Sequence, residues 1–153
     1  MSIKEKISSL GLSLPTAAAP VAAYVPAVKS GNLVFTAGQL PVVDGKLLKE
    51  GKVGREVTAE EAKELAQICA LNALAAISLV ADLDQIERVV RVGGFVNCAP
   101  GFTAIPGVIN GASEFLIKIF GDINGKHART AVGVAELPLN APVEVEVIVQ
   151  LKN

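Results

Sequence analysis

The chain has 153 residues, of which 51% are hydrophobic and 19% charged, and its formal net charge is −1. This length predicts a single domain over residues 1–153 that can bury a core without disulfides, and the composition excludes a disordered chain. The absence of any lysine- or arginine-rich run argues against a nucleic-acid partner, and the apolar excess favours burial between subunits.

Cys69, Cys98 and the single histidine, His127, cannot form a structural zinc site, so the sequence predicts no metal. Free thiols that serve as packing residues in a reducing compartment are the simplest interpretation of the two cysteines. The stretch 12–28 is apolar, but three prolines interrupt it, and no segment has the length of a membrane span. We therefore expect a cytoplasmic protein with no membrane partner.

The first elements are expected to be short. Residues 2–10 are typical of a small amphipathic helix that ends at Gly11. After a Pro/Ala connector, the apolar segments 23–28 and 33–38 flank a Gly-Asn pair, which predicts a hairpin. Asp44-Gly45 predicts a second tight turn.

The segment 58–81 is the clearest helix. Thr58 and Glu61 have the spacing of a capping box, and an apolar stripe runs from Leu65 to Val80. Gln67 and Asn72 are expected to lie on the solvated face.

The second half predicts a strand at 85–97, a helix at 108–122, and strands at 129–136 and 143–151. Gly93-Gly94 within the first of these strands indicates a bulge or a close backbone approach. The element order is ββ-α-β-α-ββ, which predicts an α+β fold with a mixed sheet and two helices packed on one face.

The strand 129–136 has an unusual alternation. Thr130, Val132 and Val134 fit a buried face, whereas the other face carries Arg129 followed only by residues no larger than alanine. We expect this strand to pair with 143–151 in a hairpin, with Arg129 and Glu144 on one helix-free face that docks onto another subunit.

Arg129 then has two interpretations. It could form an intersubunit salt bridge, or its planar fork could hold a small carboxylate. In the second case the backbone N–H of Gly38 could complete the anion site.

Three motifs resemble the YjgF/RidA family, whose members are also described as L-PSP endoribonucleases. "FTAGQLP" (35–41) resembles its T-S-G-Q-x-P signature, and "ARTAVGVAELP" (128–138) its R-x-x-V-x-V-x-x-L-P segment. "VEVEVIV" (143–149) is similar to its I-E-I-E-A-I-A strand. The same element order holds over nearly the whole chain, and Tyr24 falls where the family has a pocket tyrosine.

The resemblance implies a chorismate-mutase-like fold, a homotrimer with clefts between subunits, and hydrolysis of 2-imino or enamine acids such as 2-aminoacrylate to 2-keto acids and ammonia. It implies that Arg129 holds the substrate carboxylate, that Gly38 offers a backbone N–H and Tyr24 lines the pocket, and that Glu144 activates water. An imine is already electrophilic, so this chemistry needs no cofactor.

The chain also departs from the family pattern. Ala37 replaces the signature serine, Ala131 replaces a cysteine, and the segment 97–113 is longer and richer in glycine and proline than usual. A non-catalytic trimer that binds a 2-keto acid or similar carboxylate is therefore the alternative, whereas the near-neutral charge and the lack of a basic, aromatic surface argue against a ribonuclease. His127 is either a proton-transfer group or a loop residue.

Overall fold

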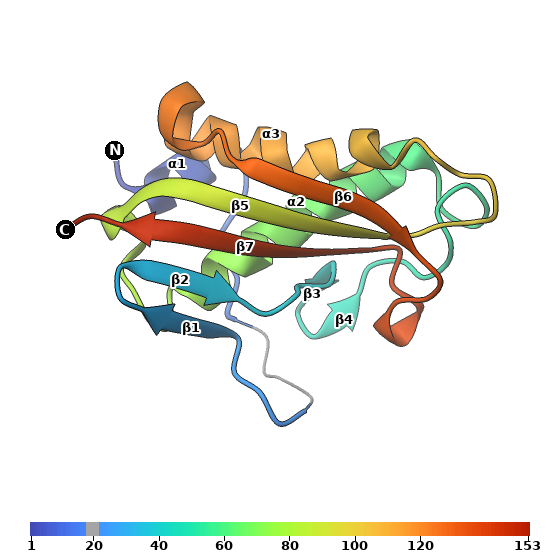
Figure 1. Cartoon of the computed structure of the whole chain (residues 1–153), viewed down its shortest axis with the longest axis horizontal. Coiled ribbons are helices and arrows are strands. Elements are labelled where there is room, and N and C mark those ends of the chain that lie inside the picture. The colour runs from blue at the N-terminus through green and yellow to red at the C-terminus, as the bar shows by residue number, and fades with distance from the viewer. Residues whose placement is uncertain (18–21) are drawn as a thin grey trace.

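The computed structural model describes residues 1–17 and 22–153, which form an α+β fold (Figure 1). Its helices and strands, in chain order, are α1 (Ile3–Ser9), β1 (Ala27–Ser30), β2 (Leu33–Thr36), β3 (Val42–Val43), β4 (Lys46–Leu47), α2 (Ala59–Ile77), β5 (Ile86–Asn97), α3 (Ile105–Asn124), β6 (Ala128–Val134) and β7 (Val143–Leu151). Two short 3-10 helices, Leu83–Gln85 and Pro138–Asn140, precede β5 and β7. The predicted Pro/Ala connector, which precedes the segment 23–28, includes residues 18–21, which lie outside the described residues.

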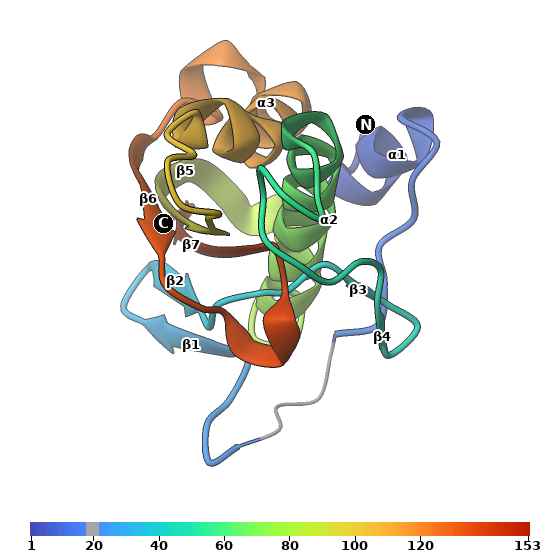
Figure 2. The ribbon, with the colours of Figure 1, turned by 90° about the vertical axis from the view of Figure 1, so that its right-hand side faces the viewer.

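Five strands form one mixed sheet in the order β1-β2-β7-β5-β6, and β3 pairs with β4 separately. β5 and β6 run parallel, while the other neighbours in the sheet are antiparallel. The long helices α2 and α3 lie side by side on one face of this sheet, and α1 lies against α3 (Figures 1 and 2). The predicted fold class, a mixed sheet with two helices on one face, is confirmed. Within the described residues, no helix is both long and apolar enough to cross a membrane.

Local sequence signals account for several element ends. Thr58 caps α2, and its side chain and that of Glu61 form the predicted reciprocal capping box. The β3–β4 turn has positive φ at Asp44 (50°) and Gly45 (79°), which is the geometry that a two-residue hairpin turn requires. Gly11, with a φ of 74°, follows α1 as expected.

The core lies between the sheet and the two long helices. On β7, every second residue from Val143 to Leu151 is buried, and on β5 Val89, Val92 and Val96 are fully buried. The predicted apolar stripe of α2 packs onto this valine surface, although Val80 lies beyond the end of the helix and is 37% exposed. The hydrophobic core therefore consists of the strand side chains that point to one face of the sheet and the helix side chains that pack on them.

The predicted hairpin of the last two strands is wrong. β5 lies between β6 and β7, pairing with both. The connection from β5 through α3 to β6 is a crossover, and a crossover of this kind returns the chain parallel to the strand that it left. β6 therefore occupies the edge beside β5, and β7 inserts on the other side.

The predicted orientation of β6 is also wrong. Arg129 pairs with Val92 of β5, whose side chain faces the helices, so Arg129 points toward α3. A Cβ on Gly133 would lie 2.9 Å from the Sγ of Cys98 and 3.1 Å from Ile105. The small residues on this face of β6 thus make room for α3 and the segment before it, and Val132, 40% exposed, lies on the helix-free face.

Asn72 does not lie on a solvated face as predicted. It is buried on α2, where its Nδ2 donates hydrogen bonds to the carbonyl oxygens of Leu40 and Val42 at 3.0 and 2.9 Å. These carbonyls belong to the segment after β2, which needs donors because it does not continue in the main sheet.

Glycines allow the layers to approach each other closely. A Cβ on Gly94 would lie 2.5 Å from the Ile109 side chain, and one on Gly111 would overlap the carbonyl oxygen of Lys63 on α2. Close approach, one of the two expectations for Gly93-Gly94, is confirmed. The register irregularities of β5 lie earlier, between Ile86 and Arg91.

We expect Gly111→Ala to lower the free energy of unfolding by about 1–3 kcal/mol, because the added methyl group meets backbone that cannot rotate away. Gly107→Ala, in the same helix with nothing within 4 Å of the added methyl group, should instead raise it by up to about 1 kcal/mol through helix propensity. Urea unfolding at one protein concentration measures both. Equal stabilities of the two variants would contradict the close helix contact.

Candidate functional site

Gly38 and Glu144 meet where β2 gives way to a short loop beside β7. Gln39 pairs with Val145 through two backbone hydrogen bonds of 2.8 and 3.0 Å, and these fix the loop against β7. The Glu144 side chain points to the helix-free face of the sheet, and a Cβ on residue 38 would overlap its Oε1 atom. Only a glycine leaves room for the carboxylate in this position.

The environment of Glu144 favours its protonated form. The side chain is half-buried, and this burial raises the pKa of its carboxyl group; the nearby Glu146 raises that pKa further. The carboxylate has no hydrogen-bond partner among the described residues. In that part of the chain every fully buried side-chain oxygen does have a partner. The oxygens of Glu144 therefore reach solvent, and a carboxylate with a raised pKa at an open position is suited to accept a proton from water.

The backbone beside this carboxylate carries an open donor. Ala37 donates its N–H to the carbonyl of Pro26 and Gln39 donates to Val145, but the Gly38 N–H has no partner among residues 1–17 and 22–153. An N–H that does not enter the sheet is available to an oxygen of a bound ligand.

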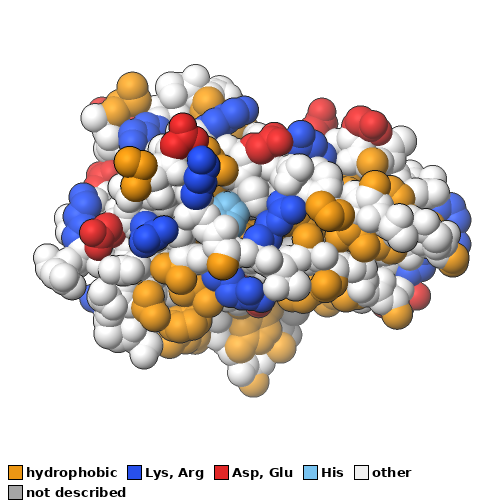
Figure 3. All heavy atoms as spheres, turned by 45° about the horizontal axis from the view of Figure 1, so that its top comes forward, with side chains coloured by type: hydrophobic (Ala, Val, Ile, Leu, Met, Phe, Trp, Pro, Cys, Tyr) orange, Lys and Arg blue, Asp and Glu red, His pale blue; other side chains and the backbone are white. Residues whose placement is uncertain are grey.

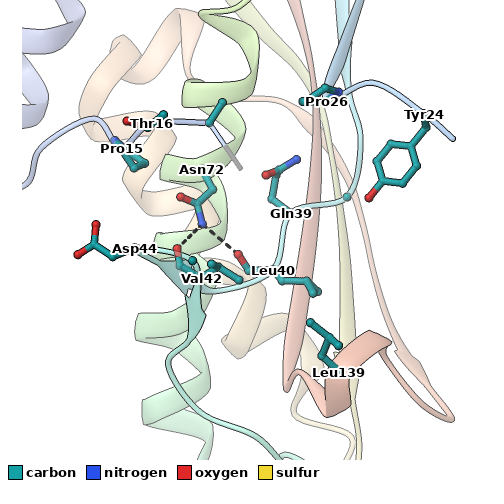
Figure 4. A pocket seen from close by; sticks show the side chains of 13 residues that line it. Pro15, Thr16, Tyr24, Pro26, Gln39, Leu40, Val42, Asp44, Asn72 and Leu139 are labelled. Atoms are coloured by element: carbon teal, nitrogen blue, oxygen red, sulfur yellow. Dashed lines mark hydrogen bonds between the residues drawn. The ribbon is translucent and has the colours of Figure 1, made fainter. Parts of the chain in front are cut away.

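Tyr24 and Gly38 line a cavity of about 590 Å³ between α2, the loop after β2 and the residues before β1 (Figure 4). Tyr24 is half exposed. The structure thus brings together three of the predicted site residues, Tyr24, Gly38 and Glu144, at one end of β2.

Arg129 lies apart from these three residues in the structure, on β6 beside α3. Its Nη1 donates to the Oδ1 of Asn110 at 2.8 Å and to the Oγ of Ser113 at 3.3 Å, and its Nη2 reaches the carbonyl of Pro106 at 3.4 Å. Asn110 and Ser113 are three residues apart and so share one face of α3. Of the five guanidinium donors, the Nε–H and one Nη2–H have no partner in the described chain, and this pair is the edge that matches a carboxylate.

His127 extends the network that holds Arg129. Its Nδ1 lies 2.6 Å from the carbonyl oxygen of Gly125, and its Nε2 lies 2.8 Å from the Oγ of Ser113. A carbonyl oxygen only accepts, so Nδ1 carries the proton and Ser113 donates to Nε2 in the neutral ring. Burial lowers the pKa of His127, the Gly125 hydrogen bond opposes this, and Arg129 lowers the pKa further. Figure 3 shows the histidine at the surface among lysine and arginine side chains.

One chain does not join Arg129 to the other three residues. β5 separates β6 from β7, so the strands that carry Arg129 and Glu144 are about 10 Å apart. The two side chains also point to opposite faces of the sheet, contrary to the shared face predicted from a hairpin. The sequence interpretation missed Asn110 and Ser113, for which the only signal was two small polar residues three positions apart on one face of the predicted helix.

The two cysteines behave as packing residues. Cys69 is fully buried, and burial raises the pKa of its thiol well above the ordinary value. Burial also raises the pKa of the Cys98 thiol, although Lys52 opposes that change. Both groups are therefore neutral thiols at neutral pH, which does not suit a nucleophile.

Comparisons with known proteins agree with the motifs. The family model described as "YjgF/chorismate mutase-like, putative endoribonuclease" matches residues 4–151. The chain is 41% identical over 152 residues to protein TCP17 of Trypanosoma cruzi, covering 99% of this chain and 95% of that protein. It is 33% identical over 141 residues to a 2-iminobutanoate/2-iminopropanoate deaminase of Dermatophagoides farinae, covering 92% and 95%.

A solved structure extends this agreement to the fold. The crystal structure of a protein of unknown function from Agrobacterium tumefaciens matches with a TM-score of 0.88 and 42% identity, over 98% of this chain and 92% of that one. The family resemblance inferred from the segments around Gly38, Arg129 and Glu144 is thus confirmed. The chain belongs to the YjgF/chorismate mutase-like family.

Proposed function

We propose that the protein is a hydrolytic deaminase of 2-imino acids, which it converts to 2-keto acids and ammonia. The observation that carries this proposal is the half-buried Glu144 carboxylate with a raised pKa, packed against Gly38 and open to solvent. A relative with 33% identity is named as a deaminase of 2-iminobutanoate and 2-iminopropanoate, which supports the choice of substrate class.

The proposed site lies between two copies of the chain. Arg129 faces away from Glu144 within one chain, but β6 is an edge strand and the helix-free face exposes Val28, Phe35 and Val132 at 52%, 40% and 40%. Exposed apolar side chains on an open sheet favour burial against another subunit. In a homotrimer, each cleft would combine Tyr24, Gly38 and Glu144 of one copy with Arg129 of the next.

The residues then have distinct roles. The open Nε/Nη2 edge of Arg129 holds the substrate carboxylate, and Asn110 and Ser113 fix the plane of the guanidinium. The Gly38 N–H binds a substrate oxygen, and Glu144 positions the attacking water. Because the imine carbon is already electrophilic, orientation and proton transfer supply most of the rate enhancement.

In the proposed reaction, Glu144 accepts a proton from water and later returns it to the leaving nitrogen. The oxygen of water bonds to the carbon of the protonated imine while a proton of that water passes to the Glu144 carboxylate. Glu144 then protonates the amine nitrogen, the C–N bond breaks, and the remaining hydroxyl proton leaves with ammonia as ammonium, which yields the 2-keto acid.

A second candidate is a non-catalytic binder of 2-keto acids. The observation that favours it is the replacement of the family serine and cysteine by Ala37 and Ala131. Neither missing group is the proposed base, so the deaminase remains the first proposal. Arg129 serves both functions, whereas only the deaminase needs Glu144.

Arg129→Lys should weaken binding of 2-ketobutyrate by about 1–3 kcal/mol, since lysine keeps the charge but loses the two-pronged geometry. Calorimetric titration measures the change. The control is Arg91→Lys, on the opposite face of the adjacent strand β5, where Arg91 donates to Thr130. Unchanged affinity in Arg129→Lys would remove Arg129 from the site.

Glu144→Gln should bind 2-ketobutyrate normally and lose about 100-fold or more of its rate with enzymatically generated 2-aminoacrylate. Glu146→Gln, two residues along the same face, should keep the rate. Removing the Glu146 charge lowers the pKa of Glu144, so the rise of kcat/KM with pH should move to lower pH in Glu146→Gln. Equal rates in Glu144→Gln and wild type would contradict the assigned base.

Co-expression tests whether two copies share the site. Arg129→Ala and Glu144→Gln chains, each inactive alone, should together recover about one quarter of the wild-type rate, because a head-to-tail ring pairs intact groups at that frequency. Arg129→Ala mixed with a differently tagged copy of Arg129→Ala is the matched control and should recover none. No recovery in the first mixture, with mixed oligomers verified by mass spectrometry, would place the whole site within one chain.

A further inference from the structure

The cavity next to Gly38 has a chemical character that the proposed reaction does not use. Its volume, about 590 Å³, lies in the range of small-molecule sites. Prolines and leucines make up much of its wall, including Pro15, Pro26, Leu40 and Leu139, and no lysine, arginine or histidine lines it in the described part of the chain.

Asn72 presents a hydrogen-bond acceptor to this cavity. Both hydrogens of its Nδ2 are taken by the carbonyl oxygens of Leu40 and Val42, and carbonyls only accept. The amide cannot be turned around without losing both bonds, so its Oδ1 is the atom that has no hydrogen-bond partner among the described residues. The side chain is 7% exposed, yet no buried side-chain oxygen of the described residues lacks a partner. Oδ1 is therefore accessible from the cavity that Asn72 lines (Figure 4).

Gln39 presents a second acceptor, although one hydrogen of its Nε2 also has no partner among the described residues. Its Nε2 donates to the carbonyl oxygen of Ala37 at 3.2 Å, which fixes the orientation of the amide and leaves Oε1 without a partner among the described residues. Gln39 is 8% exposed and lines the cavity. Figure 4 shows Asn72 on α2 and Gln39 on the loop beside β7, so the two acceptors come from different walls.

The lining also contains donors, namely the Gly38 N–H and the hydroxyl groups of Thr16 and Tyr24, of which the hydroxyl groups can accept as well. Asp44, at the rim, adds a carboxylate, and the ring of Tyr24 offers an aromatic face, to which ammonium groups are attracted. A buried acceptor without a donor costs free energy, and an anion would bring further acceptors. A group that has several N–H donors and no acceptor matches this wall best, and an ammonium group has three.

We propose that this cavity binds the ammonium group of a small organic cation. Since Gly38 belongs both to the cavity and to the candidate active site, the bound group is the side chain of the imino acid substrate; this last assignment rests on the proposed function. The cation site itself depends only on the acceptors and the absence of cationic side chains.

Three probes of equal chain length separate charge from shape. n-Butylammonium, butan-1-ol and butyrate are titrated into the wild-type protein at constant ionic strength, with binding followed by NMR or calorimetry. We expect one site per chain for butylammonium, at least about tenfold weaker binding of butan-1-ol, and no binding of butyrate at this site. Equal binding of the alcohol and the ammonium, or no binding of the ammonium, would overturn the proposal.

Two variants locate the site. Gln39→Met removes one acceptor and keeps the length of the side chain, and Asp44→Asn removes the rim charge at an exposed turn. Each should weaken butylammonium binding by roughly 5- to 20-fold. Asp122→Asn, an equal loss of charge at the exposed end of α3, should not change it. Unchanged affinity in both test variants would place the cation elsewhere. Asn72→Leu is a poorer test because it also removes donors from two backbone carbonyls.

The same titrations distinguish this proposal from the deaminase. Butylammonium should bind Arg129→Lys as it binds wild type, whereas 2-ketobutyrate should bind that variant more weakly. If 2-ketobutyrate binds through Arg129 while the ammonium does not bind, the cavity proposal fails and the deaminase stands. If the ammonium binds while 2-ketobutyrate does not, the cation site stands and the proposed active site fails.

Discussion

Burial of one valine face of the sheet beneath α2 and α3 is the constraint on which the rest of the structure depends. It fixes the alternation of β5 and β7, so that the valines of β7 enter the core while Glu144 and Glu146 face the other way. Because a strand cannot slip by one residue without exchanging its two faces, the position of Glu144 follows from the core. The only further requirement for the position of this carboxylate is the glycine at residue 38, against which it packs.

The same burial separates the chemistry of the chain into two parts. The crossover through α3 brings β6 to the sheet edge with Arg129 on the helix side, where polar residues of α3 orient it. Glu144 lies two strands away on the opposite face. A long cation surrounded by acceptors costs little to bury partly, whereas a carboxylate without partners is more easily protonated. The surroundings of Arg129 and those of Glu144 therefore position each side chain separately. Only the association of two chains could bring the two side chains to one site.

Donors and acceptors are also distributed unevenly around Gly38. On one side stand an open backbone N–H and, in the proposed assembly, the free edge of a guanidinium, both suited to a carboxylate. On the other side the cavity is lined by the amide side chains of Gln39 and Asn72, together with Tyr24 and Asp44. A molecule with an anionic end and a cationic end could bind to the donor side and the acceptor side at once. Such a molecule would bind in one orientation, which a uniformly charged cleft would not impose.

The sequence by itself determined the elements and several of their ends. Capping residues, turn glycines and alternating valines act over a few residues, which is why the start of α2, the Asp44-Gly45 turn and the bounds of β7 were predicted correctly, whereas α2 ends four residues earlier than expected. The motifs around Gly38 and Glu144 likewise indicated the family, because each is a short run of residues that can be compared directly, although the contact between the two appears only in the folded chain. These features depend on local geometry, and local geometry can be inferred from the order of residues.

Only the tertiary structure decided which strands are neighbours and which way β6 faces. Both assignments depend on the crossover through α3, since a run of small residues fits a helix contact as well as a subunit contact, and no local signal separates the two. The same holds for Asn72, a polar residue on a helix that looks solvated until the loop after β2 supplies two carbonyls to bind it. The hydrogen-bond needs of distant backbone decide the positions of such side chains, and those needs exist only once the chain has folded.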